Sequence, residues 1–371
     1  MGLDRQAHPS VSVARLEIAF QTLILSFARL GGQRRGLRGR DGPVRRPSRG
    51  DVGRRCRARV TRASVPGGIA GDIDPDRDTI DRGGAQVIPR SYLYVPGDRP
   101  DKLARAFGRG ADALIVDLED AVAPAARPAA RDVVASWLQD HPPPQGIEVW
   151  IRVNPGADGC TDVERIGAAP WLTGVLAAKT ENREELEALD SALGRAESSA
   201  GMDYGVLAVV PLLESATAFV FARELARGPR VRRLQVGEAD LRADCGIELG
   251  DEERELLYVR SRLVLLSAAL RLDPPVAPVS ADFRNPERLR ASTKELARLG
   301  FVGRGCIHPA QVPIVNEVFT PDPLQARRAR ELVERFERVV EAGGGVILDD
   351  EGRMLDEAIV RSARRIMRMV R

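Results

Sequence analysis

The sequence predicts an α/β fold, a (β/α)8 TIM barrel preceded by a disordered N-terminal extension and followed by a C-terminal arm. From residue 90 onward, short apolar runs rich in β-formers alternate with longer amphipathic stretches, which is typical of βα units around a parallel sheet. Eight such runs occur, the number of strands in this barrel. Polar residues follow the runs, at the positions where such a barrel builds its active site.

The predicted strands are short and are bounded by polar or turn-forming residues. They lie at residues 92–96, 113–118, 148–153, 174–178, 205–213, 233–236, 276–281 and 305–307. Helical patterns lie between them, at 101–109, 183–193, 216–227 and 285–299. A doubly wound open sheet is the competing fold, but no GxGxxG motif follows the first strand, which ends in VPGDRP at 95–100. We therefore favour the barrel.

The composition excludes a membrane protein and a zinc or disulfide scaffold. Hydrophobic residues make up 43% and charged residues 29% of the 371 positions. No apolar run approaches the roughly 18 residues that span a bilayer, so we expect a soluble, cytoplasmic protein. The four cysteines lie far apart with no CxxC pair, and three histidines occur. Any metal is therefore expected to be bound by oxygen ligands.

Residues 1–88 form a separate segment of low complexity. Residues 1–63 contain fifteen arginines and four acidic residues, and the stretch 31–84 is dense in Arg, Gly, Pro and Asp. Such a composition buries little apolar surface, so we expect the extension to be disordered. It is interpreted as a nucleic-acid arm, a targeting segment or translated sequence upstream of the true start. The third interpretation is favoured, and no nucleic-acid partner is expected.

Two further segments complete the predicted domain organisation. Residues 89–322 hold the eight runs and form the catalytic barrel. Residues 323–371 contain a predicted helix at 323–342, then a triple-glycine hinge at 343–345 and an arm. Because glycine leaves the backbone free, the arm can swing away from its own barrel and cover a neighbouring subunit.

Polar residues gather at one place in the pattern, the carboxyl ends of the predicted strands. In chain order they are Asp117, Glu119, Asp120, Arg152, Asn154, Lys179, Glu181, Glu214, Glu238, Asp240, Asp282 and His308. In a (β/α)8 barrel these ends share one rim, so residues far apart in the sequence converge on a single pocket. The sequence therefore predicts an active site at this rim.

Two of these acids, Glu214 and Asp240, end successive predicted strands. Neighbouring strands lie roughly 4.8 Å apart, so two carboxylates at the same height can reach one cation. Two carboxylates with waters are a ligand set for Mg²⁺, which keeps several waters and leaves positions for a substrate oxygen. The alternative is that each acid is solvated and caps the next helix.

Arg152 and His308 lie at the same rim. Arg152 can fork to a carboxylate or an oxyanion through two parallel hydrogen bonds, which a lysine cannot do. The alternative is a salt bridge to Glu119 or Asp120, and both roles can hold together. His308 directly precedes a proline, and we interpret it as a structural hydrogen-bonding residue.

Six blocks of the sequence resemble the citrate lyase beta-subunit-like branch of the HpcH/HpaI aldolase family. They are YLYVPGDRP at 92–100, DLEDAV at 117–122, RVN at 152–154, ESA at 214–216, GEADL at 237–241 and CIHPAQ at 306–311. The resemblance covers roughly residues 90–370 in order. It implies a TIM barrel, usually trimeric, that handles Mg²⁺, a short 2-oxo acid and often an acyl-CoA. Such enzymes make or break the carbon–carbon bond of a malyl, citramalyl or citryl thioester.

The resemblance implies roles for individual residues. Glu214 and Asp240 match the Mg²⁺ ligands, and Arg152 matches the arginine that holds the carbonyl and carboxylate of the oxo acid. The matched acidic motif, which orients metal-bound water and this arginine, consists of Asp117, Glu119 and Asp120.

The chain departs from the family pattern at two places. After the fourth strand, where relatives usually read Pro-Lys-Val-Glu, it reads AKTE at 178–181, which keeps the charges but loses the proline. We place Lys179 among the substrate-binding residues, together with Arg152, Glu119 and Asp117. Near the C-terminus, where relatives often read Met-Ile-Asp-Pro, it reads MLDE at 354–357.

The second departure contains Asp356. In relatives that make acyl-CoA, the arm lies over a neighbour's active site and contributes an aspartate, which here is Asp356. The resemblance therefore implies Asp356 as acid and base, with Arg152 and Asp120 as further catalytic residues. The alternative is an exposed acid in the first turn of a helix.

These observations predict a Mg²⁺-dependent carbon–carbon lyase that cleaves or forms a 3-hydroxy-acyl thioester. Its expected partners are a 2-oxo acid, an acyl-CoA and further copies of the chain in a homotrimer. Three alternatives stay open. The first is a beta subunit of a multi-subunit citrate lyase, which needs an acyl-carrier partner. The second is a class II 2-oxo acid aldolase, which uses a histidine of the strand-2 motif as base. Asp120 occupies that region here and no histidine lies near, so this alternative is disfavoured. The third is a non-catalytic regulator that uses the Arg-rich N-terminal arm.

Overall fold

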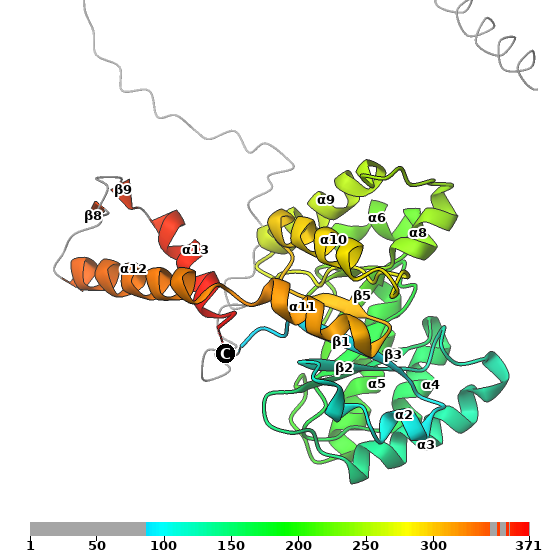
Figure 1. Ribbon diagram of the computed structural model, residues 1–371. Coiled ribbons are helices and arrows are strands. Elements are labelled where there is room, and N and C mark those ends of the chain that lie inside the picture. Colours follow the sequence, from blue (N-terminus) through cyan, green and yellow to red (C-terminus); the bar gives the residue numbers. More distant parts are fainter. Residues whose placement is uncertain (1–86, 342–346, 349–353, 356, 371) are drawn as a thin grey trace, which may run out of the picture. The chain divides into compact units, whose positions relative to one another are not determined.

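The computed structural model describes residues 87–341, 347–348, 354–355 and 357–370 (Figure 1). These residues belong to one compact unit. The predicted extension up to residue 86, the glycine hinge and Asp356 lie outside the described residues. Ile88, which the sequence assigned to the extension, is buried, and its N–H donates to the carbonyl of Arg368 at 3.1 Å. Ile88 therefore packs against the described part of the chain.

Seven parallel strands form one sheet. They are β1 (Ser91–Pro96), β2 (Ala113–Asp117), β3 (Glu148–Val153), β4 (Gly174–Ala177), β5 (Ala208–Leu213), β6 (Gln235–Val236) and β7 (Arg304–Cys306). Their order in the sheet is β6-β5-β4-β3-β2-β1-β7. The register places Asp117, the last residue of β2, opposite Arg152 of β3. Side chains at the carboxyl ends of neighbouring strands are thereby brought to the same edge of the sheet.

Val276 and Ala277 join the two outer strands of this sheet and close the barrel. Val276 bridges Gln235 of β6, and Ala277 bridges Arg304 of β7. The predicted (β/α)8 barrel is therefore confirmed, but the strand predicted at 276–281 is wrong in extent, because only these two residues form bridges. A proline flanks them on each side, and proline has no N–H to donate to a neighbouring strand.

Helices connect the strands, as Figure 1 shows. The elements of the barrel are α2 (Pro100–Leu103), η3 (Phe107–Arg109), η4 (Pro124–Ala126), α3 (Arg127–Asp140), α4 (Gly156–Ile166), α5 (Arg183–Ser199), α6 (Ala216–Val220), α7 (Ala222–Leu225), α8 (Glu238–Cys245), η5 (Arg254–Leu256), α9 (Leu257–Ala269), α10 (Pro286–Leu299), η6 (Pro309–Gln311) and α11 (Val312–Phe319). The single helix predicted at 101–109 is instead α2 and η3. The helix predicted at 216–227 is divided at Phe221, where ψ is 13°. Among the helices described, none has both the length and the apolar composition that crossing a membrane requires.

The core has two parts, one inside the barrel and one between the strands and the helices. The buried residues of the inner part are Tyr92, Ala113, Ile115, Trp150, Leu176, Ala178, Ala208, Val210, Leu212 and Val276. The outer part is a larger cluster that joins the other strand faces to the helices. Because successive side chains of a strand point to opposite faces, strands covered on both faces are almost continuously apolar. This double burial explains why short apolar runs marked the strands.

Two helices follow the barrel, α12 (Pro323–Glu341) and α13 (Glu357–Met367). They pack against each other through a small apolar cluster. Its buried members are Ala329, Val333, Phe336, Val360 and Ala363. This cluster makes the two helices a hairpin with a core of its own.

The segment between these helices contains a short antiparallel pair, β8 (Ile347–Leu348) and β9 (Met354–Leu355). At the other end of the hairpin, Arg365 of α13 donates to the carbonyls of Gly300 and Phe301 at 2.5 and 3.5 Å. The end of α13 is therefore attached to the barrel of its own chain.

Candidate active site

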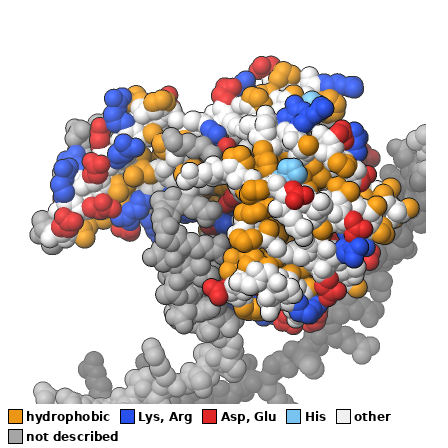
Figure 2. Space-filling model, turned by 90° about the horizontal axis from the view of Figure 1, so that it is seen from below, with side chains coloured by type: hydrophobic (Ala, Val, Ile, Leu, Met, Phe, Trp, Pro, Cys, Tyr) orange, Lys and Arg blue, Asp and Glu red, His pale blue; other side chains and the backbone are white. Residues whose placement is uncertain are grey.

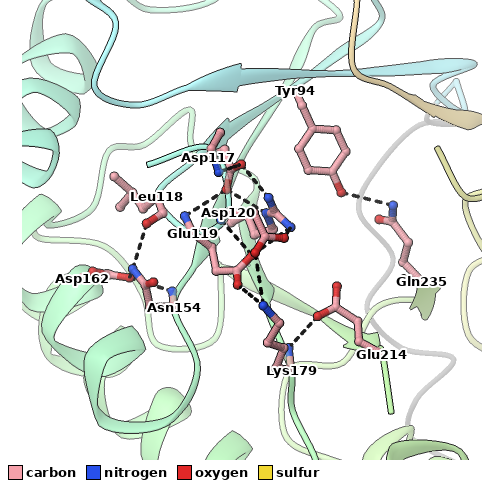
Figure 3. Close-up of polar contacts among 12 residues, drawn as sticks. Tyr94, Asp117, Leu118, Glu119, Asp120, Asn154, Asp162, Lys179, Glu214 and Gln235 are labelled. Atoms are coloured by element: carbon pink, nitrogen blue, oxygen red, sulfur yellow. Dashed lines mark hydrogen bonds and ion pairs between the residues drawn. The ribbon is translucent and has the colours of Figure 1, made fainter. Parts of the chain in front are cut away.

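The carboxyl end of β2 supplies three acidic side chains, Asp117, Glu119 and Asp120 (Figure 3). Asp117 is buried, and its carboxylate accepts hydrogen bonds from the N–H groups of Glu119 at 3.0 Å and Ala121 at 3.2 Å. These bonds fold the residues after the strand into a turn. The turn holds a buried Glu119 beside Asp120, whose side chain is 50% exposed.

Arg152 of β3 pairs with all three acids. Its Nε and Nη2 fork onto the two oxygens of Asp117 at 2.7 and 2.6 Å. Its Nη1 lies 2.9 Å from Glu119 and 3.0 Å from Asp120. The salt bridge that the sequence allowed is therefore present, and the bidentate contact is to Asp117. A guanidinium has five N–H groups, and the second N–H of Nη2 takes part in none of these contacts. Burial opposes the charge, but Asp117 above all raises the pKa of Arg152, so it stays charged.

Lys179, two residues beyond β4, links this acidic turn to the end of β5. Its φ is 49°, in the left-handed region that residues other than glycine seldom occupy. Its Nζ lies 2.5 Å from Glu119 and 3.1 Å from Asp120. Its backbone N–H donates to Glu214 Oε2 at 3.2 Å. The unusual backbone thus directs both the ammonium group and an N–H toward acids of other strands, as Figure 3 shows.

Glu119 and Asp120 share these partners but differ in acidity. Burial raises the pKa of Glu119. Burial acts in the same direction on Asp120, but the hydrogen bond with Glu119 and the charges of Arg152 and Lys179 outweigh it and lower its pKa. Glu119 is therefore the more easily protonated of the two, and Asp120 stays a carboxylate.

Glu214 follows β5 and is buried among other negative charges. Burial raises its pKa to about 7, and the charges of Glu119 and Asp240 add to this effect while Arg152 opposes it. Asp240 lies in the first turn of α8 and not at the end of a strand as predicted. A Cβ on Gly237 would lie 2.5 Å from Glu214 Oε1, so a larger residue at this position would displace the carboxylate.

The donors around Glu214 fit a hard divalent cation. Glu214 and Asp240 offer carboxylate oxygens, and the raised pKa of Glu214 reflects buried negative charge that a cation would neutralise. In the described part of the chain, no three or more His, Cys, Asp or Glu side chains gather as a complete metal cage. Mg²⁺ does not need one, because it binds through one or two carboxylates and keeps several waters. The residues present therefore fit Mg²⁺.

Tyr94 of β1 and Gln235 of β6 lie inside the barrel mouth, and sequence reasoning gave them no role. The Gln235 amide donates to the Tyr94 hydroxyl oxygen at 3.3 Å. Arg152 lies over the Tyr94 ring, with Cζ 5.3 Å from the ring centroid. Burial raises the pKa of Tyr94, so the hydroxyl keeps its proton. The available signal was the two-residue period of β1, which turns Tyr92 and Tyr94 to the same interior face.

Asn154 and Glu181 stand at the rim but are held by neighbouring groups. The Asn154 side chain donates to the carbonyl of Leu118 and to Asp162 of α4, both at 2.9 Å. Glu181 accepts a hydrogen bond from the Ser215 hydroxyl at 2.6 Å. These contacts tie the ends of β3 and β4 to neighbouring loops and helices, and so support the site.

Three other rim residues have structural partners. Glu238 accepts a bidentate contact from Arg260 at 2.7 and 2.9 Å. Asp282 is exposed and accepts a backbone N–H from two residues further on at 3.1 Å. His308 accepts the N–H of Ala310 at 3.2 Å and so caps η6. His308 has the structural role that the sequence indicated.

An α/β barrel that gathers an arginine, a lysine and several carboxylates at the carboxyl ends of its strands has the layout of an enzyme with an acid-rich active site. The HpcH/HpaI aldolase/citrate lyase family model matches residues 90–309. The chain belongs to this family, and the resemblance recognised in the sequence is confirmed.

Individual relatives agree with this assignment. A citrate lyase subunit beta-like protein of Deinococcus radiodurans is 30% identical over 290 residues, which cover 76% of this chain and 97% of that protein. The mitochondrial citramalyl-CoA lyase of Rattus norvegicus is 28% identical over 293 residues, covering 76% and 86%. The structure of CitE from Mycobacterium tuberculosis with magnesium, acetoacetate and coenzyme A has a TM-score of 0.58 and 26% identity, covering 77% and 99%. The predicted class of enzyme, a carbon–carbon lyase, is confirmed.

Proposed function

We propose that the protein is a Mg²⁺-dependent lyase that cleaves or forms a 3-hydroxy-acyl thioester of the malyl-, citramalyl- or citryl-CoA type. Cleavage gives a 2-oxo acid and an acyl thioester. The observation that carries this proposal is the arrangement of two side chains at one rim. Arg152 is held in place by Asp117, and the buried Glu214 lies near other carboxylates. The magnesium and coenzyme A bound in the CitE structure support it.

Glu214 and Asp240 would hold the cation, which when bound supplies a Lewis acid for the carboxylate and adjacent oxygen of the substrate. The chain prepares Glu214 for this role. The Lys179 N–H binds Oε2, and Gly237 leaves room for Oε1. The carboxylate is therefore presented in a defined orientation.

Arg152 binds the carbonyl and carboxylate oxygens of the 2-oxo acid, with the Nη2 N–H that its acid partners leave available. Asp117 holds the plane of the guanidinium, while Glu119 and Asp120 hold Nη1. Lys179, bound to the same two acids, adds a second positive charge. Because these side chains are fixed before the substrate arrives, charge that develops on its oxygen meets oriented donors.

Cleavage requires a base and an acid. A base takes the proton of the substrate hydroxyl, the carbon–carbon bond breaks, and the thioester enolate takes up a proton at carbon. Our candidate is Asp356 of a neighbouring chain in a homotrimer. Inactive Asp356→Ala and Glu214→Ala chains, refolded together, should regain activity at about a quarter of the sites in a cyclic oligomer. No recovery despite verified subunit exchange would argue against a shared site.

The proposed partners are small molecules. Coenzyme A is the proposed carrier of the acyl group, because the rat relative is named for a CoA ester and coenzyme A is bound in the CitE structure. Figure 2 shows acidic and basic side chains interspersed over one face, and the described part of that face has no continuous basic stripe that would suit nucleic acid. The proposed location is the cytoplasm.

A cleavage screen tests the proposal. The full-length protein is incubated with malyl-, citramalyl- or citryl-CoA, with Mg²⁺ or with EDTA, and the release of glyoxylate, pyruvate and oxaloacetate is measured. We expect release of a 2-oxo acid that EDTA abolishes. Thioester hydrolysis without carbon–carbon cleavage, or release that EDTA does not reduce, would contradict the proposal. Cleavage only of substrates on an acyl-carrier protein would indicate a citrate lyase beta subunit.

A further inference from the structure

Tyr94 differs from the other polar side chains of the barrel mouth in what its hydroxyl does. Arg152 and Lys179 bind acids at the carboxyl end of β2, and the Ser215 hydroxyl donates to Glu181. The Tyr94 oxygen instead accepts a hydrogen bond from Gln235 at 3.3 Å. Among the hydrogen bonds of the described residues, none uses the Tyr94 proton. The mouth therefore contains an O–H donor whose capacity is unused.

The contacts around Tyr94 hold its ring in place. The ring packs against the inner core, and the Arg152 guanidinium covers it. A Cβ on Gly305 of β7 would lie 3.4 Å from Tyr94 Cε2 and 3.7 Å from Gln235 Nε2, so the edge of the ring also lies close to β7. Figure 3 shows the hydroxyl end of the ring pointing toward the side of the site that holds Gln235 and Glu214. A ring confined in this way presents its donor with little loss of entropy on binding.

The proposed cleavage develops charge on two substrate oxygens. Arg152, Glu214 and Asp240 serve the oxygen that becomes the carbonyl of the 2-oxo acid. The other is the thioester carbonyl oxygen, which receives the electron pair of the breaking carbon–carbon bond and becomes an enolate oxygen. The residues assigned so far leave this second oxygen without a donor.

We propose that Tyr94, oriented by Gln235, donates a hydrogen bond to the thioester carbonyl oxygen and stabilises the enolate. This inference rests on the proposed lyase function. The phenolic proton stays on Tyr94 throughout. The hydroxyl proton of the substrate passes to the base, and the enolate carbon takes a proton to give the acyl thioester, so atoms and charge balance.

The test is Tyr94→Phe in the full-length protein, which keeps the ring and removes only the donor. We expect kcat to fall about 10²-fold, on the scale of one lost oxyanion donor. In the condensation direction the KM for the 2-oxo acid should be unchanged, and so should Mg²⁺ affinity measured by calorimetry. A rise in that KM with unchanged kcat would assign Tyr94 to the oxo acid and overturn the inference.

Tyr92→Phe is the matched control, because Tyr92 lies on the same strand and interior face but its hydroxyl binds Arg233. This variant should keep the wild-type kcat. Gln235→Leu should lower kcat by a smaller factor and add no further loss in the Tyr94→Phe background, because Gln235 acts through Tyr94. If Tyr94→Phe does not fold, the fall in kcat of the single variant Gln235→Leu still tests the inference.

The outcomes distinguish a failure of the role of Tyr94 from a failure of the proposed lyase function. A wild-type protein that cleaves its thioester, together with a Tyr94→Phe variant of equal kcat, would overturn the role of Tyr94 alone. Additive losses for the Gln235 and Tyr94 variants would overturn the orienting role of Gln235. A wild-type protein that cleaves none of the thioesters would overturn the lyase function, and the role of Tyr94 with it.

Discussion

The two ends of the barrel carry the same kinds of buried polar side chain but differ in charge balance. Acids and arginines are matched at the amino ends of the strands, whereas carboxylates are in excess at the carboxyl ends. At the amino ends of the strands, Arg233 is 2% exposed and donates to the Tyr92 hydroxyl and, at 3.3 Å, to Asp273. Arg232 donates to Asp273 at 2.7 Å and contacts Glu148 at 3.3 Å. Acids and arginines are therefore matched at this end.

The pKa directions of two acids show the difference. Burial would raise the pKa of Asp273, but Arg233 and Arg232 outweigh it and lower the pKa. At the carboxyl ends, burial raises the pKa of Glu214 to about 7, and two neighbouring carboxylates add to this effect. A network that is neutral within itself stabilises the fold, whereas one with excess charge in a pocket is suited to bind a ligand of opposite charge.

The largest expected effect comes from removing one carboxylate of the proposed metal pair, Glu214 and Asp240. Glu214→Ala or Asp240→Ala should abolish Mg²⁺-dependent activity, because the remaining carboxylate would hold the cation more weakly and would no longer fix its position beside Arg152. Neither change should lower the melting temperature, since each removes one of several like charges. Calorimetry of Mg²⁺ binding provides a readout independent of catalysis. Full activity in either variant, with Mg²⁺ still bound, would remove the proposed site.

A smaller loss is expected from Arg152→Lys, which keeps the charge at this end but not the planar fork. A lysine cannot bind Asp117 and a substrate carboxylate with the same geometry, so kcat/KM should fall roughly 10²-fold. Arg183→Lys is the control, because Arg183 forms an exposed pair with Glu187 on α5. If Arg152→Lys has near-wild-type kinetics, Arg152 serves only to pair with the acids after β2.

The sequence made the carboxyl ends easier to predict than the amino ends. Parallel strands buried on both faces are apolar runs, so charged residues such as Glu214 and Lys179 stand out where each run stops. The fork between Arg152 and Asp117 could not be predicted, because it depends on the register that places these residues opposite each other. Tyr94 was missed because its one polar atom lies within an apolar run.

Other details depend on tertiary contacts. The strand predicted at 276–281 has only two bridge residues because neighbouring prolines remove the N–H groups that would extend it. Asp240 reaches the site from the first turn of α8, since β6 ends at Val236. The matched network of Arg233 and Asp273 joins residues whose separation in sequence carries no periodic signal. Such pairings arise only when the strands have closed into a barrel.

The smallest effect on catalysis is expected from Asp273→Asn, which breaks the balance at the amino end. The change keeps the shape of the side chain but leaves Arg233 buried with less countercharge. Removing one partner of a buried pair costs about 3 kcal/mol, so the free energy of unfolding should fall by that order, measured by urea denaturation. Both kcat and the dependence on Mg²⁺ should match the wild-type protein, because no substrate group is expected at this end.

The pH dependence of this loss gives the sharper test. The pKa of Asp273 is lowered in the folded protein, so its stabilising contribution is present above its unfolded pKa of about 3.9 and is lost as pH falls through the folded value. The difference in unfolding free energy between wild type and Asp273→Asn should therefore be constant near neutral pH and shrink below pH about 4. Asp282→Asn, at an exposed loop position, should leave the free energy of unfolding at neutral pH unchanged. If Asp273→Asn instead lowers kcat at unchanged stability, the amino end takes part in the reaction, and the division between a structural end and a ligand-binding end is wrong.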